Sequence, residues 1–208
     1  MSRQFLEAID AIRQSIEANK EFLTELDGAI GDGDHGINLA RGFSAVMSRL
    51  KLEPDIDMSS GLKKIGMTLI SSVGGAAGPL YGTAFMRAST AAQGKPELSR
   101  ELAAQMLLAA IQGIKDRGKA VRGDKTMIDS LEPAYDAYIK GIDEGRSLAE
   151  CMEMACQAAE EGVEYTRTIA ARKGRASYLG GRSIGHQDPG ATSSLIILKT
   201  LAGLCREN

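Results

Sequence analysis

The segment DPGATSSLIILKTLAGL, residues 188–204, decides between an all-helical and a mixed fold. Within it, Ser194–Leu198 is the best candidate for a β-strand in the sequence. However, an acidic residue followed by proline, here Asp188 and Pro189, is typical of the first positions of a helix. We therefore predict that the segment is a buried helix and that the chain contains no convincing strand.

Helical spacing of apolar residues continues on the N-terminal side of this segment. The further helices that we predict cover residues 5–26 (one helix or a helix pair), 37–50, 62 to the glycines at 74–75, 79–92, 99–114 and 124–138, and a segment that opens at Ser147. Ser147 and Glu150 match a capping box, and Ser99 is an expected N-cap. About eight helices with short connections and no linker predict one all-α domain over residues 1–208, folded as a bundle or closed helical barrel.

Composition restricts the functional classes. The 208 residues are 43% hydrophobic and 25% charged, as in ordinary globular proteins, and the net charge of −2 gives no indication of a nucleic-acid partner. The opening residues MSRQFLEAIDAIRQSI lack the apolar core of a signal peptide, and no uncharged apolar stretch approaches about 18 residues. We expect a cytoplasmic protein with no membrane span, whose three cysteines are reduced thiols.

Four glycine-rich or charged stretches lie between the predicted helices, and the first of them is acidic. It reads DGAIGDGDHGIN, residues 27–38, and places Asp27, Asp32 and Asp34 within eight residues. Carboxylates at this density repel one another, and Mg²⁺ binds such a group together with water and phosphate. The helix that follows would offer free N–H groups to phosphate oxygens, with His35 as a further donor. A solvated acidic turn remains the alternative at this point.

Several motifs in these stretches resemble known signatures but lack their context. Gly31–Gly36 fits GxGxxG, but no strand precedes it, as a dinucleotide-binding fold requires. The acidic loop lacks the final Glu of an EF-hand, and SSVGGAAGPLYGT, residues 71–83, lacks the Lys of a P-loop. Residues 181–185 fit the GxSxG pattern of hydrolases, but they lie in a basic loop without a preceding strand.

The remaining stretches, residues 71–82, 116–127 and 172–190, supply small and basic residues. The small residues of the first would let a ligand or another helix approach closely. The other two contain much of the positive charge, namely Arg117, Lys119, Arg122, Lys125, Arg172, Lys173, Arg175 and Arg182. Such clusters suit a polyphosphate or an acidic partner surface, and a solvated run of charges is the alternative.

Four motifs, GDGDHG, SSVGGAAGPLYGT, RGKAVRGDKTM and GRASYLGGRSIGHQDPGATS, together resemble the nucleotide-binding L subunits of bacterial dihydroxyacetone kinases over essentially the whole chain. The resemblance implies an eight-helix antiparallel up-and-down barrel with the nucleotide site in the loops at one end. It implies that Asp27, Asp32 and Asp34 bind two Mg²⁺ ions on the phosphates of ADP or ATP. The other nucleotide-binding positions that it implies are His35, Gly36, Ile37, Asn38, Ala76, Ala77, Gly118, Met127, Arg175, Asp188 and Pro189. Ala77 stands where relatives often have Ser, so a hydroxyl contact to phosphate is lost there.

The resemblance also implies a role. The chain would keep ADP as a cofactor, take phosphate from a phosphohistidine on the M subunit of the phosphotransferase system, and pass it to dihydroxyacetone on the K subunit. It would then be a phosphotransferase that is incomplete without its K subunit. The alternative is the L subunit of an ATP-dependent kinase for dihydroxyacetone or a related ketose or tetrulose. A nucleotide-loaded module that contacts a transcription regulator is the non-enzymatic alternative.

Overall fold

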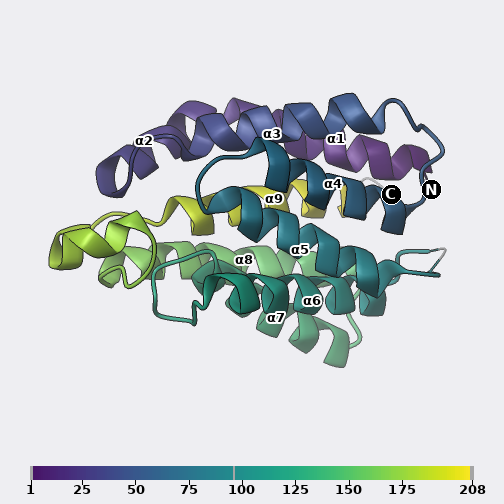
Figure 1. Cartoon of the computed structure of the whole chain (residues 1–208). Helices are drawn as coiled ribbons and strands as arrows, with labels where there is room; N and C mark the ends of the chain where they lie inside the picture. The colour runs from purple at the N-terminus through teal and green to yellow at the C-terminus, as the bar shows by residue number, and fades with distance from the viewer. Residues whose placement is uncertain (1, 96, 207–208) are drawn as a thin grey trace.

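The computed structural model describes residues 2–95 and 97–206, and this part of the chain contains nine α-helices, one 3₁₀ helix and no strand (Figure 1). The elements are α1 (Ser2–Ala18), α2 (Lys20–Ile30), α3 (His35–Leu50), α4 (Met58–Ser72), α5 (Ala77–Ala92), α6 (Arg100–Gly118), α7 (Ile128–Asp143), α8 (Leu148–Thr168), the 3₁₀ helix η1 (Arg175–Ser183) and α9 (Pro189–Arg206). The prediction that residues 188–204 form a helix is therefore confirmed.

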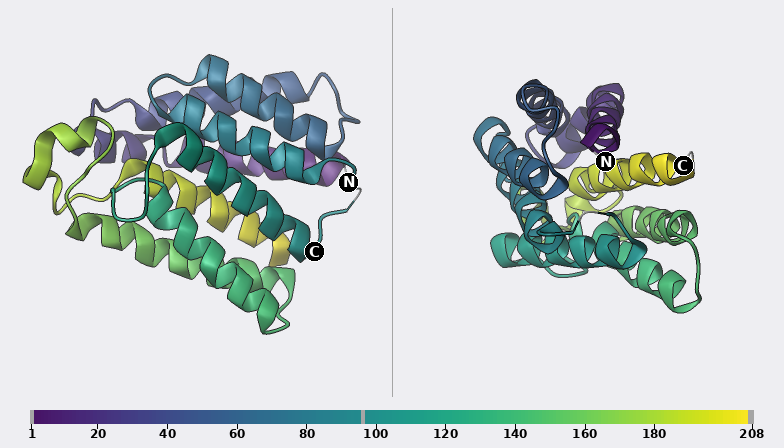
Figure 2. Two further views of the ribbon diagram at one scale, coloured as in Figure 1. Left: turned by 60° about the horizontal axis from the view of Figure 1, so that its bottom comes forward. Right: turned by 90° about the vertical axis from the view of Figure 1, so that its right-hand side faces the viewer.

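Eight of these α-helices form a closed ring. From α3 to α9, each helix packs against the next one along the chain, and α1 packs against both α3 and α9. The right panel of Figure 2 shows the helices nearly end-on around a common interior, and Figure 1 shows that neighbours in the ring run in opposite directions. The predicted all-α, antiparallel eight-helix barrel is confirmed. The ninth helix, α2, continues α1 after a break at Asn19, so the helix-pair alternative for residues 5–26 is the correct one.

Three predicted helix starts are confirmed by hydrogen bonds of their caps. Ser99 Oγ accepts the N–H of Leu102 at 3.1 Å, at the start of α6. Ser147 and Glu150 form the reciprocal hydrogen bonds of a capping box at the start of α8. Asp188 Oδ2 accepts the N–H of Ala191 at 2.7 Å, just before α9. Each cap satisfies an N–H group that has no partner inside its own helix.

Two predictions about the segments between the helices are wrong. The helix expected to begin at Asp124 or Lys125 begins at Ile128 instead. The carboxylate of Asp129 accepts the N–H groups of Gly123 and Thr126, and Lys125 has a left-handed φ of 62°, so the preceding residues form a loop. Residues 172–190, expected as a loop, contain the 3₁₀ helix η1.

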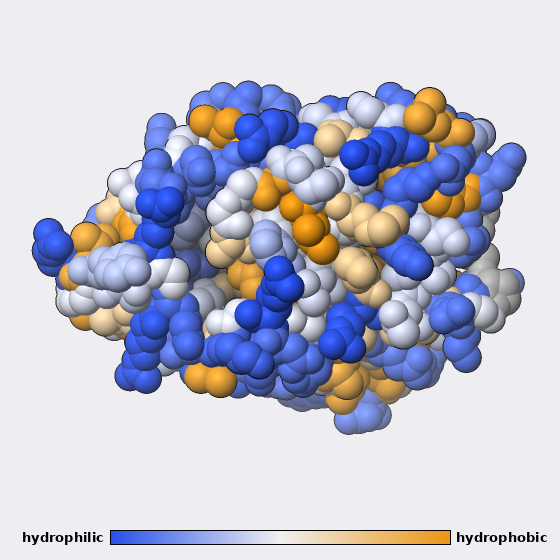
Figure 3. All heavy atoms as spheres, viewed as in Figure 1, coloured by the Kyte–Doolittle hydropathy of each residue, from blue (hydrophilic) through white to orange (hydrophobic). Residues whose placement is uncertain are grey.

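The interior of the barrel is apolar but not completely filled. Phe43, Ile65, Leu69 and Ile128 are among its fully buried side chains. A cavity of about 910 Å³, lined mainly by apolar side chains, lies inside the ring. The outer face seen in Figure 3 is mainly hydrophilic, with apolar residues in small separate groups. None of the helices in the described residues is long and apolar enough to cross a membrane.

The antiparallel arrangement determines where the connections lie. Both chain ends lie at one end of the barrel, on the right in Figure 1. The connections α2–α3, α4–α5, α6–α7 and α8–α9 lie at the opposite end. These four connections are the four glycine-rich or charged stretches of the sequence, so the fold brings all of them together.

Candidate functional site

A cavity of about 440 Å³ lies at the end of the barrel opposite the chain termini, and residues from all four glycine-rich or charged connections line it. All but two of the residues expected to bind metal or nucleotide line it, namely Asp27, Asp32, Asp34, His35, Asn38, Ala76, Ala77, Gly118, Met127, Arg175, Asp188 and Pro189. The two exceptions are Gly36, which is buried where α3 packs against α2, and Ile37, which is 50% exposed.

The acidic residues of the first loop form one cluster. Asp27, Asp32 and Asp34 each offer a carboxylate oxygen, and these oxygens lie within 4.8 Å of one another. Asp27 also orders the loop, because its Oδ2 accepts the N–H groups of Asp34 at 2.9 Å and His35 at 3.2 Å. Gly31 is needed here, since a Cβ at this position would lie 2.2 Å from Asp27 Oδ1. Three convergent carboxylates are a donor set that suits a hard divalent cation, with further positions open to water and phosphate.

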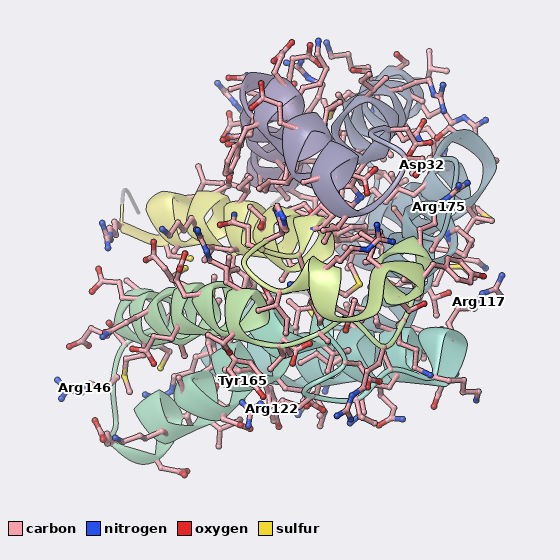
Figure 4. The ribbon with its side chains drawn as sticks, turned by 90° about the vertical axis from the view of Figure 1, so that its left-hand side faces the viewer. Asp32, Arg117, Arg122, Arg146, Tyr165 and Arg175 are labelled. Carbon is pink, nitrogen blue, oxygen red and sulfur yellow. The ribbon has the colours of Figure 1, made fainter. Side chains whose placement is uncertain are left out.

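A cationic side chain from η1 faces this cluster. Arg175 Nη2 lies 2.9 Å from Asp32 Oδ2, and Figure 4 shows the two side chains together at the loop end. The two side chains are 69% and 37% exposed, and an ion pair with this exposure contributes little stability. The guanidinium can therefore exchange Asp32 for another anion, such as a phosphate, at small cost.

His35 lies between the acidic cluster and α9. Its Nε2 atom is 2.9 Å from Ser193 Oγ. Burial lowers the pKa of His35, and the attraction of Asp27 and Asp34 only partly opposes this effect. The imidazole is therefore neutral at pH 7, and one of its two nitrogens is an acceptor.

Asp188 is a half-buried acidic residue that also lines the cavity. Burial raises the pKa of Asp188 to about 7, and the hydrogen bond from the Ala191 N–H opposes this shift. The same oxygen caps α9, so the residue serves the fold as well as the cavity.

We expect Asp188→Asn to remove part of the pH dependence of stability in the nucleotide-free protein. Because the pKa is raised in the folded state, the folded protein binds this proton more tightly than the unfolded chain does. The contribution of Asp188 to the free energy of unfolding therefore falls as pH rises from about 4 to about 7. The Asn side chain can still cap α9. In urea unfolding, the free energy of unfolding of the unchanged protein relative to that of the variant should therefore fall as pH rises across this range. A difference that stayed constant with pH would contradict the assignment.

The structure also identifies a buried cation that the sequence interpretation placed among surface charges. Lys125 is 1% exposed, and its Nζ donates to the main-chain oxygens of Thr166 at 2.5 Å, Ile169 at 3.4 Å and His186. It thereby ties the α6–α7 connection to the α8–α9 connection. Thr166 in turn accepts the N–H of Asp188 through its hydroxyl at 2.9 Å.

The other basic residues of these two stretches differ in their positions. Arg117 and Lys173 line the cavity with Arg175, whereas Arg122 lies 3.2 Å from Asp136 in an exposed ion pair. Of the residues in the two basic stretches, Lys125 therefore lines the cavity from a buried position, whereas Arg122 fits the alternative of a solvated charge. A buried lysine leaves no clear signal in a sequence, since its charge is typical of the surface.

Comparison with known proteins agrees with this geometry. Residues 29–203 match the DAK2 domain family. The chain is 48% identical over 187 residues to the "PEP-dependent dihydroxyacetone kinase, ADP-binding subunit DhaL" of Escherichia coli (strain K12), which covers 90% of this chain and 89% of the relative. It is 40% identical over 196 residues to the "PTS-dependent dihydroxyacetone kinase, ADP-binding subunit DhaL" of Lactococcus lactis, which covers 94% of both chains.

The fold has a solved counterpart. The crystal structure of the dihydroxyacetone kinase from C. freundii in complex with AMP-PNP and Mg²⁺ matches with a TM-score of 0.73 at 23% identity. The match covers 95% of this chain and 33% of that longer chain, and it supports the barrel fold. Together with the DhaL subunits of dihydroxyacetone kinases, this chain belongs to the DAK2 domain family.

Proposed function

We propose that this chain is the nucleotide-carrying subunit of a dihydroxyacetone kinase. In this role it holds ADP, receives phosphate from a phosphohistidine on an M-type protein of the phosphotransferase system, and passes the phosphate to dihydroxyacetone on a K subunit. The observation that carries the proposal is the cluster of Asp27, Asp32 and Asp34 on a cavity at the start of α3. Relatives of nearly the same extent are named as ADP-binding subunits of such kinases.

The ligand assignments follow from the position of each group. Asp27, Asp32 and Asp34 would hold Mg²⁺, and we propose two ions. The phosphates would lie near His35 and Asn38. They would also lie near the N–H groups of Gly36 and Ile37, because N–H groups in the first turn of a helix have no partner within the helix. The residues that would surround the phosphates and the adenosine are Ala76, Ala77, Gly118, Met127, Arg175, Asp188 and Pro189.

Charge balance supports two ions rather than none. The three aspartates and an ADP of charge about −3 add up to about −6, which is costly to confine in one cavity. Two divalent ions reduce this to about −2. Arg117, Lys173 and Arg175 line the same cavity and can offset the remainder.

The chemistry asked of this chain is positioning and charge neutralisation. Phosphoryl transfer needs little covalent help from a protein, and bound Mg²⁺ supplies most of the neutralisation at the phosphate oxygens. Asp27 orders the loop because its carboxylate accepts the N–H groups of Asp34 and His35. Arg175 can exchange its ion pair with Asp32 for one with a phosphate oxygen. The groups that give up and accept the phosphate would both come from partner proteins.

The donor and setting are part of the proposal. We propose the phosphocarrier as donor because the two relatives above are named as dependent on phosphoenolpyruvate or the phosphotransferase system. We further propose one domain over residues 1–208, a cytoplasmic location, and an additional contact with a transcription regulator. The alternative function is the L subunit of an ATP-dependent kinase for dihydroxyacetone or a related ketose or tetrulose.

Turnover with defined donors separates the two functions. The purified chain, its K subunit and dihydroxyacetone are supplied either with phosphoenolpyruvate and the phosphocarrier proteins or with ATP alone. We expect steady product formation only with the phosphocarrier, because the resident ADP is rephosphorylated in place. Sustained turnover with ATP alone would favour the alternative, and a panel of ketoses would then identify the acceptor.

A further inference from the structure

A chain of buried hydroxyl groups connects His35 to the interior of the barrel. Ser193 Oγ lies 2.9 Å from His35 Nε2 and 2.7 Å from the hydroxyl of Tyr81. The Tyr81 hydroxyl lies 2.9 Å from Ser194 Oγ, and Ser194 Oγ lies 2.9 Å from the main-chain oxygen of Gly190. Tyr81, Ser193 and Ser194 are all buried.

This hydroxyl chain lies between the apolar cavity inside the ring and the polar cavity at the loop end. Tyr81 and Ser194 line the apolar cavity, whereas His35 and Gly190 line the polar cavity at the loop end. Buried hydroxyl groups beside an apolar space must satisfy one another or the main chain. Burial raises the pKa of Tyr81 to about 12, so its hydroxyl keeps its proton and takes part as a donor.

The protons in this hydroxyl chain can be counted. Tyr81, Ser193 and Ser194 have one hydroxyl proton each, and the two contacts between Tyr81 and the serines use two of the three. The third goes either to the oxygen of Gly190, at 2.9 Å from Ser194 Oγ and 3.1 Å from Ser193 Oγ, or to His35 Nε2. If the third proton goes to the oxygen of Gly190, His35 Nε2 can donate its own proton to Ser193, and His35, Gly190 and the three hydroxyl groups form four hydrogen bonds. If the third proton goes to His35 Nε2, the same groups form three.

We propose that Tyr81 and Ser193 are positioning residues that hold His35 in the tautomer with its proton on Nε2. Nδ1 is then an acceptor, and it is the ring nitrogen that the hydroxyl chain leaves open for a ligand. If a phosphate lies beside His35, which rests on the proposed function, Nδ1 contacts it only through a bridging donor such as a water molecule or a hydroxyl group. This role is the reverse of the donor role expected for His35 from the sequence.

Nitrogen NMR of the histidine side chains tests the tautomer directly. The chain has two histidines, and His186 is exposed, so it serves as an internal reference for a freely exchanging ring. We expect the nucleotide-free protein at about pH 8 to show the His35 proton on Nε2, with slow exchange against solvent. A proton on Nδ1 of His35 would overturn the proposal, and this result needs no variant.

Two matched variants test whether the hydroxyl chain is responsible. Ser193→Ala removes the acceptor of the Nε2 proton, and Tyr81→Phe removes the hydroxyl that orients Ser193. We expect both to speed exchange of the His35 proton by about tenfold, the effect of losing one net hydrogen bond. The control is Tyr138→Phe, which removes another buried tyrosine hydroxyl, bonded to the oxygen of Arg100 at 3.0 Å.

The control separates positioning from general loosening. Tyr138→Phe should leave the His35 exchange rate unchanged, and an equal acceleration in this variant would overturn the positioning role. The tautomer is measured without nucleotide or partners. A proton on Nδ1 would therefore leave the proposed function intact, and a failure of phosphate transfer would leave the tautomer assignment intact.

Discussion

Replacement of Asp34 or Asp32 by Ala is expected to lower the affinity for ADP in the presence of Mg²⁺ by roughly 100-fold or more. Loss of a group that only orients a metal ligand typically costs about 10–100-fold in affinity, so loss of a ligand itself should cost at least as much. These two residues are better tests than Asp27, whose carboxylate also accepts two N–H groups of the loop. Removal of Asp27 would therefore disturb the loop as well as the ligand set.

Calorimetric titration of ADP with and without Mg²⁺ measures this effect. The matched control is Glu25→Ala, which removes one exposed negative charge from α2 at a residue that does not line the cavity. We expect the control to bind ADP as the unchanged protein does, and circular dichroism to show the same helical content in all variants. If the Asp32 and Asp34 variants retained ADP as tightly as the control, the metal site would be elsewhere.

Gly36→Ala is expected to lower the free energy of unfolding by about 3 kcal/mol, the upper part of the usual range for overpacking. Gly36 lies where α3 crosses α2, and a Cβ there would be 2.0 Å from the oxygen of Lys20 and 2.9 Å from the nitrogen of Thr24. Both are main-chain atoms, so the two helices would have to separate. The acidic loop between these helices would then lose its geometry, and ADP binding would weaken together with stability.

Urea unfolding, monitored by the circular dichroism signal of the helices, measures this loss of stability. Gly203→Ala is the control, because Gly203 lies in an exposed part of α9 and a Cβ there meets no atom within 4 Å. Exchange of Gly for Ala in an exposed helix interior stabilises by roughly 0.8–1 kcal/mol. The change in the free energy of unfolding should therefore be negative for Gly36→Ala and positive for Gly203→Ala. A Gly36 variant as stable as the Gly203 variant would contradict the close packing of α2 against α3.

The fold could be predicted where its determinants are local in sequence. The starts of α6, α8 and α9 depend on Ser99, Ser147 and Asp188, each of which binds an N–H group three residues ahead. The start of α7 could not be predicted in the same way. There the loop is shaped by Asp129, a buried carboxylate inside the helix that follows, and a sequence pattern does not show that an acid faces inward.

The candidate site divides along the same line. Asp27, Asp32 and Asp34 are close in sequence, so their convergence could be predicted. By contrast, the contact between His35 and Ser193 joins residues 158 positions apart, and only the closed ring of helices brings them together.

Gly36 shows a third case. The sequence places it among the nucleotide-binding residues. In the structure it lies where α3 packs against α2 and does not line the cavity. A glycine that permits helices to approach and a glycine that permits a ligand to approach are alike in sequence. They can be told apart only by the atoms that a Cβ would meet.

The central claim is that a nucleotide held by this chain carries the phosphate, and a label-transfer experiment tests it most directly. The protein is loaded with ADP and Mg²⁺, freed of unbound nucleotide, and given phosphoenolpyruvate labelled in its phosphate together with the phosphocarrier proteins. We predict that the label appears first in nucleotide bound to this chain, and that it moves to dihydroxyacetone when the K subunit is added. Label that reached dihydroxyacetone without passing through the bound nucleotide would contradict the account.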